Sequence, residues 1–180
     1  QWIVIKFLPE VQTEVERKQV DQRVFKELRQ FNQLSDIPTL TQALQESTTL
    51  IRDILGTEFV SLYQAEAEYP RLRLIAATND GERFAPTLPS TDLMRLDKTH
   101  VWVNGNRILT EIHRSAQANQ MDYLASTPLM QGGGAFGLLV VGGKGEPPAN
   151  LTVDLMELLA AMILSLFQQN LLTENLNLKV

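Results

Sequence analysis

The feature that most constrains the fold is a glycine-rich stretch, TPLMQGGGAFGLLVVGGK, at residues 127–144. Within it, Gly132, Gly134 and Gly137 have the G-x-G-x-x-G spacing of dinucleotide-binding loops. In such loops the glycines leave a strand and open a helix, whose N-terminus binds the phosphates. The stretch is therefore either a nucleotide-binding loop or a turn between two strands, and the residues after it distinguish the two.

Those residues favour the turn. A short apolar run, Leu138–Val141, follows and is ended at once by two further glycines, which is typical of a buried strand and leaves no length for a helix. The Walker pattern fails as well, because Lys144 comes one position late. We therefore predict a hairpin with strands over 126–130 and 135–142 and a turn over 131–134, where glycine reaches positive φ without steric cost.

Composition excludes several classes of function. The chain has 180 residues, which suits one domain with extensions, and 44% of them are hydrophobic. A net charge of -5 argues against a nucleic-acid-binding surface, which needs clustered Lys and Arg. The sequence contains no cysteine, which rules out a disulfide, a thiolate metal site, a cysteine nucleophile and a thioether-linked chromophore. This fits a reducing cytoplasm.

The N-terminal region has two parts. Residues 1–10, QWIVIKFLPE, are apolar with one lysine, and form either the trailing edge of a membrane helix or a short packed segment. Residues 10–33 contain no glycine or proline and are rich in helix-forming residues, which predicts a long polar helix. Its apolar residues form a thin stripe that calls for a partner helix: Val20, Val24, Leu28 and Phe31.

The rest of the chain alternates between helical and extended patterns. Apolar spacing predicts a helix over 38–55, capped by Ser35 or Asp36 and ended by Gly56. A second long helix is expected after Thr152 as its cap. The shorter elements expected between them are strands over 59–64, 71–78 and 107–112, a turn over 79–81, and helices over 90–97 and 115–122.

This order of elements resembles a GAF domain, the small-molecule sensor module of signalling proteins. The resemblance is most specific over residues 126–167, where a Pro-Leu pair, a turn, a Gly before an apolar strand and an acidic helix start follow one another. The matching residues are Pro128, Leu129, Gly137, Leu138, Thr152, Asp154, Leu158 and Leu159.

The resemblance implies an α+β fold with a central antiparallel sheet of five or six strands. Helices 38–55 and 152–167 would pack on one face, and a ligand pocket would lie on the other, under 82–106 and 113–123. It also suggests three parts in the chain: a linker or signalling helix (1–35), a GAF-like sensor domain (36–167) and an output linker helix (168–180).

Two departures leave the ligand open. The Asn-Lys-Phe-Asp-Glu signature of cyclic-nucleotide-binding members is not present. The cysteine that holds bilin chromophores is missing too, so no covalent bilin is expected. An unknown small molecule is the expected ligand.

The residues expected to line the pocket are Trp102, Ile112, His113 and Tyr123, because apolar walls with a few polar handles are typical of small-molecule sites. The alternative is that they fill the core and that no ligand exists. His100 and His113 are the only histidines. One of them could bind haem iron, as in some gas-sensing relatives, but a solvated or capping role is the simpler interpretation, and haem is not expected. Two histidines without a carboxylate at metal spacing make no zinc site.

No catalytic set is visible, so we expect a non-catalytic sensor or regulatory module. Its parent would be a cytoplasmic or membrane-anchored signalling protein: a histidine kinase of a two-component system, a cyclase or phosphodiesterase, or a transcription regulator, with the output domain C-terminal to this chain. The alternatives are a ligand-free dimerisation module and, less favoured, a small enzyme on the same scaffold such as a free methionine sulfoxide reductase, whose activity uses cysteines.

The flanking helices predict a parallel homodimer. Residues 10–34 and 152–178 each have a broad apolar face near the domain and a thin one further out, so the distal parts should find partner helices. The alternative is that both helices pack only on their own sheet. The expected interface residues are Val20, Val24, Leu28, Leu159, Met162 and Leu166.

Overall fold

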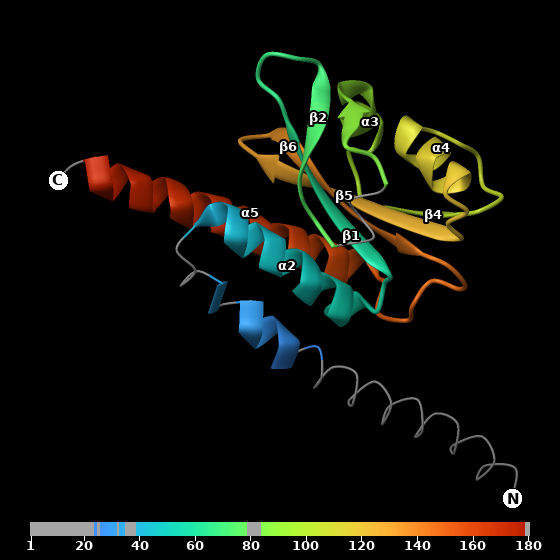
Figure 1. The fold of residues 1–180 in the computed structure, drawn as a ribbon, viewed down its shortest axis with the longest axis horizontal. Helices are drawn as coiled ribbons and strands as arrows, with labels where there is room; N and C mark the ends of the chain where they lie inside the picture. The colour runs from blue at the N-terminus through green and yellow to red at the C-terminus, as the bar shows by residue number, and fades with distance from the viewer. Residues whose placement is uncertain (1–23, 25, 32, 35–38, 79–83, 179–180) are drawn as a thin grey trace, which may run out of the picture.

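The structure, a computed structural model, describes residues 24, 26–31, 33–34, 39–78 and 84–178. One antiparallel sheet of six strands has the order β3-β2-β1-β6-β5-β4 (Figure 1). The α+β prediction with a five- or six-stranded antiparallel sheet is confirmed. The elements are α2 (Leu40–Leu55), β1 (Phe59–Ala65), β2 (Arg71–Ala77), β3 (Thr87–Pro89), α3 (Ser90–Arg95), β4 (His100–Val103), α4 (Glu111–Ala118), β5 (Tyr123–Gln131), β6 (Gly134–Gly143) and α5 (Val153–Leu178).

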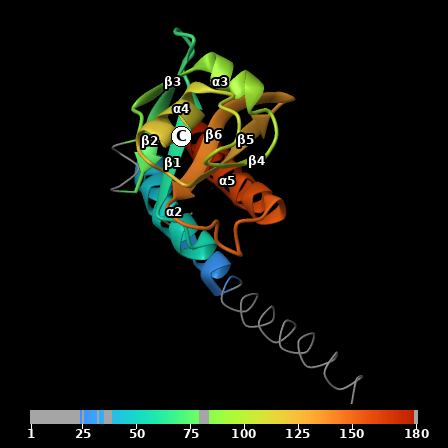
Figure 2. The same cartoon turned by 90° about the vertical axis from the view of Figure 1, so that its right-hand side faces the viewer.

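The sheet separates two layers of helices. The two long helices α2 and α5 lie on one face, and the short helices α3 and α4 lie on the other (Figures 1 and 2). Each layer buries its own apolar cluster. The cluster under α2 and α5 contains Ile51, Ile54, Leu159 and Ile163, whereas the cluster under α3 and α4 contains Trp102 and other side chains described below.

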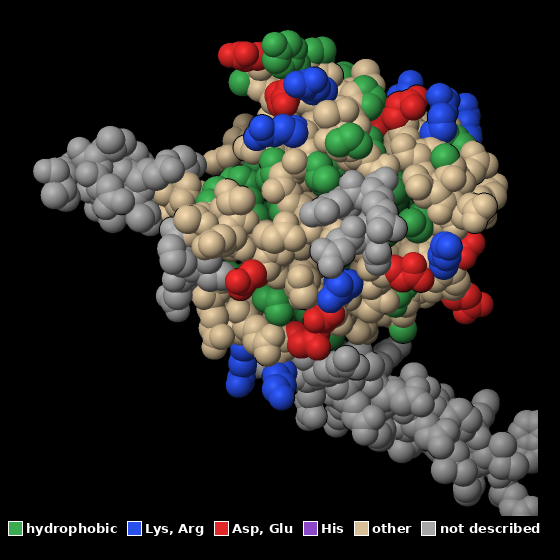
Figure 3. Space-filling model, in the orientation of Figure 1, with side chains coloured by type: hydrophobic (Ala, Val, Ile, Leu, Met, Phe, Trp, Pro, Cys, Tyr) green, Lys and Arg blue, Asp and Glu red, His purple; other side chains and the backbone are tan. Residues whose placement is uncertain are grey.

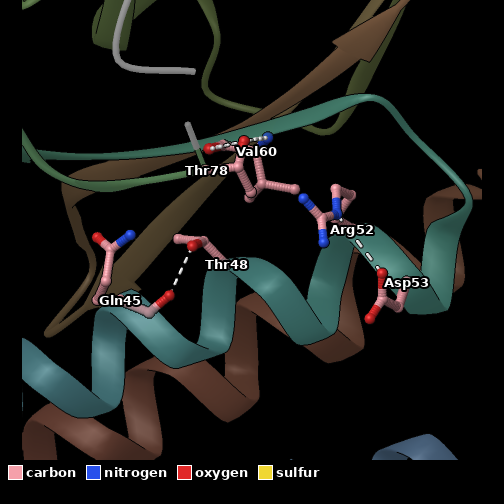
Figure 4. Close-up of polar contacts among 6 residues, drawn as sticks. All are labelled: Gln45, Thr48, Arg52, Asp53, Val60 and Thr78. Carbon is pink, nitrogen blue, oxygen red and sulfur yellow. Dashed lines mark hydrogen bonds and ion pairs between the residues drawn. The ribbon is translucent and has the colours of Figure 1, made fainter. Parts of the chain in front are cut away.

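Helix α2 is positioned by polar contacts as well as by its apolar face. The Thr39 hydroxyl caps it by accepting the Gln42 amide at 3.2 Å, and Gly56 ends it with a φ of 76°. The Gln45 side chain reaches the end of β2, donating to the Ala77 carbonyl and accepting from the Ala77 amide. Figure 4 shows Gln45 on the helix face that points toward the strands. The helix is thereby tied to the sheet in one register. The predicted cap at Ser35 or Asp36 is wrong, because α2 begins at Leu40 and Thr39 caps it. Residues 35–38 themselves lie outside the described residues.

Thr78 makes further hydrogen bonds just beyond the end of β2. Its hydroxyl accepts the Val60 amide at 3.0 Å, and its own amide donates to the Val60 carbonyl at 2.9 Å (Figure 4). The side chain thus continues the β1–β2 ladder one step beyond the end of β2, because it satisfies a backbone donor that the strand no longer reaches.

The glycine-rich stretch is a hairpin. Strands β5 and β6 pair from Tyr123↔Gly143 to Gln131↔Gly134, and Gly132 and Gly133 connect them with φ values of 61° and 82°. Positive φ at both central residues is what a tight two-residue hairpin turn requires. The predicted strand–turn–strand is confirmed, with longer strands than expected, and no helix begins at these glycines.

Further along β6, a glycine permits close packing of the strands. A Cβ placed on Gly137 would lie 2.6 Å from the Tyr63 carbonyl oxygen and 2.9 Å from a Leu129 methyl. Gly134, in the same strand, has open space where its Cβ would be. Gly137 is therefore required by packing, and Gly134 is not.

The predicted strand over 107–112 is wrong. Strand β4 lies earlier, at His100–Val103, and Glu111 and Ile112 begin helix α4, which also starts before the helix expected over 115–122. The physical reason is a cap supplied from elsewhere in the chain. The Thr110 hydroxyl accepts the His113 amide at 3.3 Å, and the Asp92 carboxylate accepts the Glu111 and Ile112 amides at 3.1 and 3.0 Å.

The C-terminal helix begins as predicted. The Thr152 hydroxyl accepts the Leu155 amide at 3.2 Å and caps α5. Of the predicted N-terminal helix, residues 26–31 are helical and Phe31 and Leu34 are buried in the apolar cluster of α2 and α5. Residues 1–23, and the turn predicted over 79–81, lie outside the described residues. No helix in the described part of the chain has the length and apolar character needed to cross a membrane.

Candidate functional site

The face of the sheet under α3 and α4 carries a group of polar side chains, three of them buried and one, His100, half-buried. Strands β4 and β5 pair His100 with Ser126 and Trp102 with Leu124, so His100, Trp102 and Ser126 share this face. Helix α4 adds His113 from above. We call His100, Trp102, His113 and Ser126 the polar cluster.

Ring contacts show that the cluster is contiguous. The His113 ring lies 5.6 Å from the Trp102 ring, stacked at an interplanar angle of 23°, and 5.5 Å from the His100 ring. Residues directly opposite in antiparallel strands have Cβ atoms about 5 Å apart, which places Ser126 beside His100. Trp102, His113 and Ser126 are each 0% exposed.

Each member of the cluster has a buried polar atom without a hydrogen-bond partner among the described residues. These atoms are His100 Nδ1, Trp102 Nε1, His113 Nε2 and Ser126 Oγ. Leaving a buried donor or acceptor unpaired costs about 1–3 kcal/mol, so native proteins rarely do so without a function or a bound molecule. Four such atoms in one contiguous group mark the site.

The protonation of His113 follows from its neighbours. Its Nδ1 lies 3.1 Å from the Thr110 hydroxyl, whose oxygen already accepts the His113 amide. Either atom of this pair can be the donor, because the hydroxyl oxygen has a second lone pair, so Nε2 is a donor or an acceptor according to the tautomer of the ring. Burial, with a smaller contribution from His100, lowers the pKa of His113 to about 4. The ring is therefore neutral at pH 7 and has one N–H donor and one acceptor nitrogen.

The carboxylate nearest this layer is already used. Asp92 is 2% exposed, and its two oxygens accept the two amides at the start of α4. Burial raises the pKa of the Asp92 carboxyl, and those two amides oppose the rise. Asp92 thus holds α4, and with it His113, against the sheet. Tyr63 closes the same layer by donating to the Ala85 carbonyl at 2.8 Å, and burial raises the pKa of its phenol.

Three of the four predicted pocket residues come together. Trp102, Ile112 and His113 lie on the α3/α4 side of the sheet and are fully buried. Tyr123 belongs to the cluster under α2 and α5, on the opposite face, and the structure does not bring it into the group. Whether the group binds a ligand stays a prediction.

The sequence analysis missed Ser126 and Asp92 as site residues and gave His100 no part in the pocket. The alternation His100–Trp102 along one strand was a usable signal, because residues i and i+2 share a face. Ser126 and Asp92 had no local signal, since their roles depend on the pairing of β4 with β5 and on the packing of α3 against α4.

The predicted dimer-interface residues occupy several environments. Leu159 and Leu166 are buried in the core of their own chain, at 0% and 6% exposure. Val24, Leu28 and Met162 are half-buried and pack against that core, and Val20 lies outside the described residues. Over residues 153–170 of α5, the large apolar side chains that are exposed are those of Val153 and Leu158. A groove of ≈ 500 Å³ runs beside this helix, lined by Thr127, Pro128, Met130, Val153, Glu157, Ala161, Leu164 and their neighbours.

The face of the molecule seen in Figure 3 has no large patch of one charge. Figure 3 shows acidic and basic side chains interspersed over the visible face. No group of three or more His, Cys, Asp or Glu side chains able to hold a metal ion occurs in the described part of the chain. A covalently attached chromophore does not fit the residues, because there is no cysteine.

Comparison with known proteins identifies the scaffold. The model of the GAF domain family matches residues 39–165. No curated protein matches the chain significantly by sequence. Several solved structures share the fold at low sequence identity.

One is the chromophore-binding domain of an unusual bacteriophytochrome from R. palustris, at a TM-score of 0.65 and 16% identity, covering 86% of this chain and 63% of that chain. The present chain thus spans less than two thirds of that domain. Another is a free methionine-R-sulfoxide reductase from Neisseria meningitidis in complex with its substrate, at a TM-score of 0.62 and 16% identity. The match covers 77% of this chain and 84% of that chain. A third is a segment of a methyl-accepting chemotaxis protein, at a TM-score of 0.61 and 22% identity. The match covers 79% of this chain and 97% of that chain.

Proposed function

The chain belongs to the GAF domain family, and we propose that it is the sensor module of a larger signalling protein and binds a small molecule at the polar cluster. The observation that carries the proposal is the set of four unpartnered polar atoms buried on the α3/α4 face. Solved relatives on this scaffold include a chromophore-binding domain and a reductase with bound substrate, which supports a binding role for the fold. The parent remains a histidine kinase, a cyclase or phosphodiesterase, or a transcription regulator in this proposal.

Binding without catalysis is part of the proposal. The chain has no cysteine nucleophile, and both Asp92 oxygens are occupied by backbone amides of α4. His113 is neutral and its Nδ1 is engaged by Thr110, so it is suited to hydrogen bonding. These groups are suited to holding and orienting a molecule. Ser126 lies opposite His100, but no hydrogen bond joins Ser126 Oγ to His100 Nδ1, as a nucleophile and its base would require.

Helix α5 gives the proposed sensor an output. It packs directly on β5, the strand that carries Ser126, and its C-terminal end projects past the sheet and α2 (Figure 1). A ligand that shifts β5 would therefore also shift the part of α5 that packs on this strand. A parallel homodimer through the flanking helices completes the proposal. Because Leu159 and Leu166 are buried in their own chain, the proposed contact uses the exposed side chains of Val153, Leu158 and Ala161, within the part of α5 whose side chains the structure describes.

The test of ligand binding is native mass spectrometry on the protein purified from cells under non-denaturing conditions, followed by denaturation and identification of any released molecule. A bound molecule at near-stoichiometric amount, lost from a His113→Leu/Ser126→Ala double variant, is the expected result. Protein that carries no molecule, and whose melting temperature responds to none of a broad metabolite set, would support the second candidate, a ligand-free dimerisation module.

The dimer is tested by light scattering at tens of micromolar. A dimer that Leu158→Glu dissociates is expected, whereas Val103→Glu, an exposed position on β4, serves as the control that leaves the mass unchanged. A monomeric wild type would contradict this part of the proposal.

A further inference from the structure

The polar cluster also constrains the chemistry of what it binds, given the proposed function. Its four unpartnered atoms differ in what they can do. Trp102 Nε1–H is a donor only. His113 Nε2 and His100 Nδ1 can each donate or accept, according to the tautomer of the ring. Ser126 adds a hydroxyl that can donate. The set therefore contains one obligate donor, the indole N–H, and three groups that are able to donate.

Acceptors for a positively charged ligand are scarce in the same layer. The one buried carboxylate, Asp92, gives both oxygens to the amides of Glu111 and Ile112. The Tyr63 hydroxyl donates to the Ala85 carbonyl and makes a second hydrogen bond with the Ser61 side chain. A buried ammonium group would find no free carboxylate here among the described residues, and an unpaired buried charge is costly.

The surroundings of the donors are flat and apolar. The stacked rings of Trp102 and His113 belong to the same buried layer as the apolar side chains of Ile112, Leu138 and Val140. Such surroundings favour an apolar body with one polar end. We propose that the polar cluster selects a ligand by an oxygen acceptor, a carboxylate or ketone oxygen on a small apolar body, which binds to the donors of Trp102, His113 and Ser126, and that it rejects amines.

Trp102 makes the proposal directly measurable. The chain has two tryptophans, so in a Trp2→Phe background the single indole N–H resonance reports on Trp102 Nε1. The probes are acetate, acetone and methylammonium, which share a small size and differ in the polar end. Saturable shifts of the indole resonance by acetate or acetone, with methylammonium leaving it unchanged, are the expected result.

Two variants and one control separate hydrogen bonding from packing. Ser126→Ala should weaken the acceptor probe roughly three- to tenfold, the loss of one neutral hydrogen bond. His113→Leu should weaken it by a similar factor, and His113→Gln, which keeps a donor, should recover part of it. Thr57→Val removes another buried hydroxyl that has no partner among the described residues, outside the polar cluster, and should change nothing. Ser126→Ala provides the test on its own if His113→Leu fails to fold.

Several outcomes would overturn the inference. Methylammonium shifting the indole resonance as strongly as acetate would do so, as would no saturable shift with any of the three probes, which would assign the cluster to buried water alone. Equal binding in wild type and Ser126→Ala would also overturn it. Native mass spectrometry that identifies a bound amine would overturn this inference while leaving the sensor function standing, so the two proposals fail separately.

Discussion

The two faces of the sheet are built on different principles. On the face under α2 and α5, which we call the helix face, the core cluster is apolar, and the buried hydroxyls of Ser47 and Thr48 donate to backbone carbonyls of α2. On the face under α3 and α4, which we call the polar face, four polar side chains contribute buried atoms that have no partner among the described residues. Each unpaired group on the polar face costs about 1–3 kcal/mol.

Truncation on the helix face should have the largest effect. Leu159→Ala removes a side chain that is 0% exposed between α5 and the sheet, and we expect a loss of about 2–5 kcal/mol in the free energy of unfolding, from lost burial and the cavity left behind. Urea denaturation measures it. Its neighbour Leu158 is 46% exposed, and Leu158→Ala should cost below about 0.5 kcal/mol. Similar losses for both would contradict the division between buried and exposed faces of α5.

On the polar face, the buried His113 should make the free energy of unfolding depend on pH. Because the pKa of His113 falls to about 4 in the folded chain from an ordinary value of 6.5, the unfolded state binds its proton first as pH falls. The folded state therefore loses stability between pH 6.5 and about 4, by up to about 3 kcal/mol. Asp92 acts in the opposite sense, since its raised pKa means that stability is lost as pH rises above its ordinary value.

Chemical denaturation at several pH values measures this contribution. His113→Asn leaves Asp92 unchanged, so the difference between wild type and variant isolates the histidine. The difference should shrink as pH falls from 6.5 to 4. A difference that stays constant over this range would mean that His113 is exposed to water.

The next largest loss of stability is expected from a substitution that crowds the helix face. Gly137→Ala places a methyl group 2.6 Å from the Tyr63 carbonyl oxygen and against Leu129, which belongs to the helix-face cluster. The strands must move apart, and we expect a loss of about 1–3 kcal/mol. Gly134 lies in the same strand and has open space where its Cβ would be, so Gly134→Ala should be close to neutral. The melting temperatures of the two variants settle the point, and equal values would contradict the close approach of β1 and β6.

The smallest change in the free energy of unfolding is expected for a substitution in the polar cluster. Ser126→Ala removes a buried hydroxyl without a partner among the described residues, so the unliganded protein should be unchanged or stabilised by up to about 1 kcal/mol. On the helix face, by comparison, Gln45→Ala breaks two hydrogen bonds to Ala77 and should destabilise by about 1–2 kcal/mol. Differential scanning calorimetry compares them. A Ser126→Ala variant that is the less stable of the two would show that this hydroxyl is paired in solution.

Local patterns predicted the helix face well. The apolar spacing of α2 and α5, the Thr152 cap and the glycine hairpin all involve residues within a few positions of one another, and the structure confirms each. The polar face was predicted only in part. Trp102, Ile112 and His113 were grouped through the resemblance to GAF domains, but Tyr123 was grouped with them although strand pairing turns its side chain to the other face.

The sequence by itself determined the elements whose signals are local: a two-glycine turn with positive φ, an amphipathic helix with its own cap, and an antiparallel hairpin. Tertiary structure alone decided that residues 111–118 form a helix, because the Asp92 carboxylate, 19 positions before Glu111, satisfies the amides that begin it. It also decided which polar groups meet, since His100, Ser126 and His113 come from three elements whose register and packing no local pattern encodes. A buried polar atom without a partner is a property of the packed molecule, and it becomes visible only once every neighbour is in place.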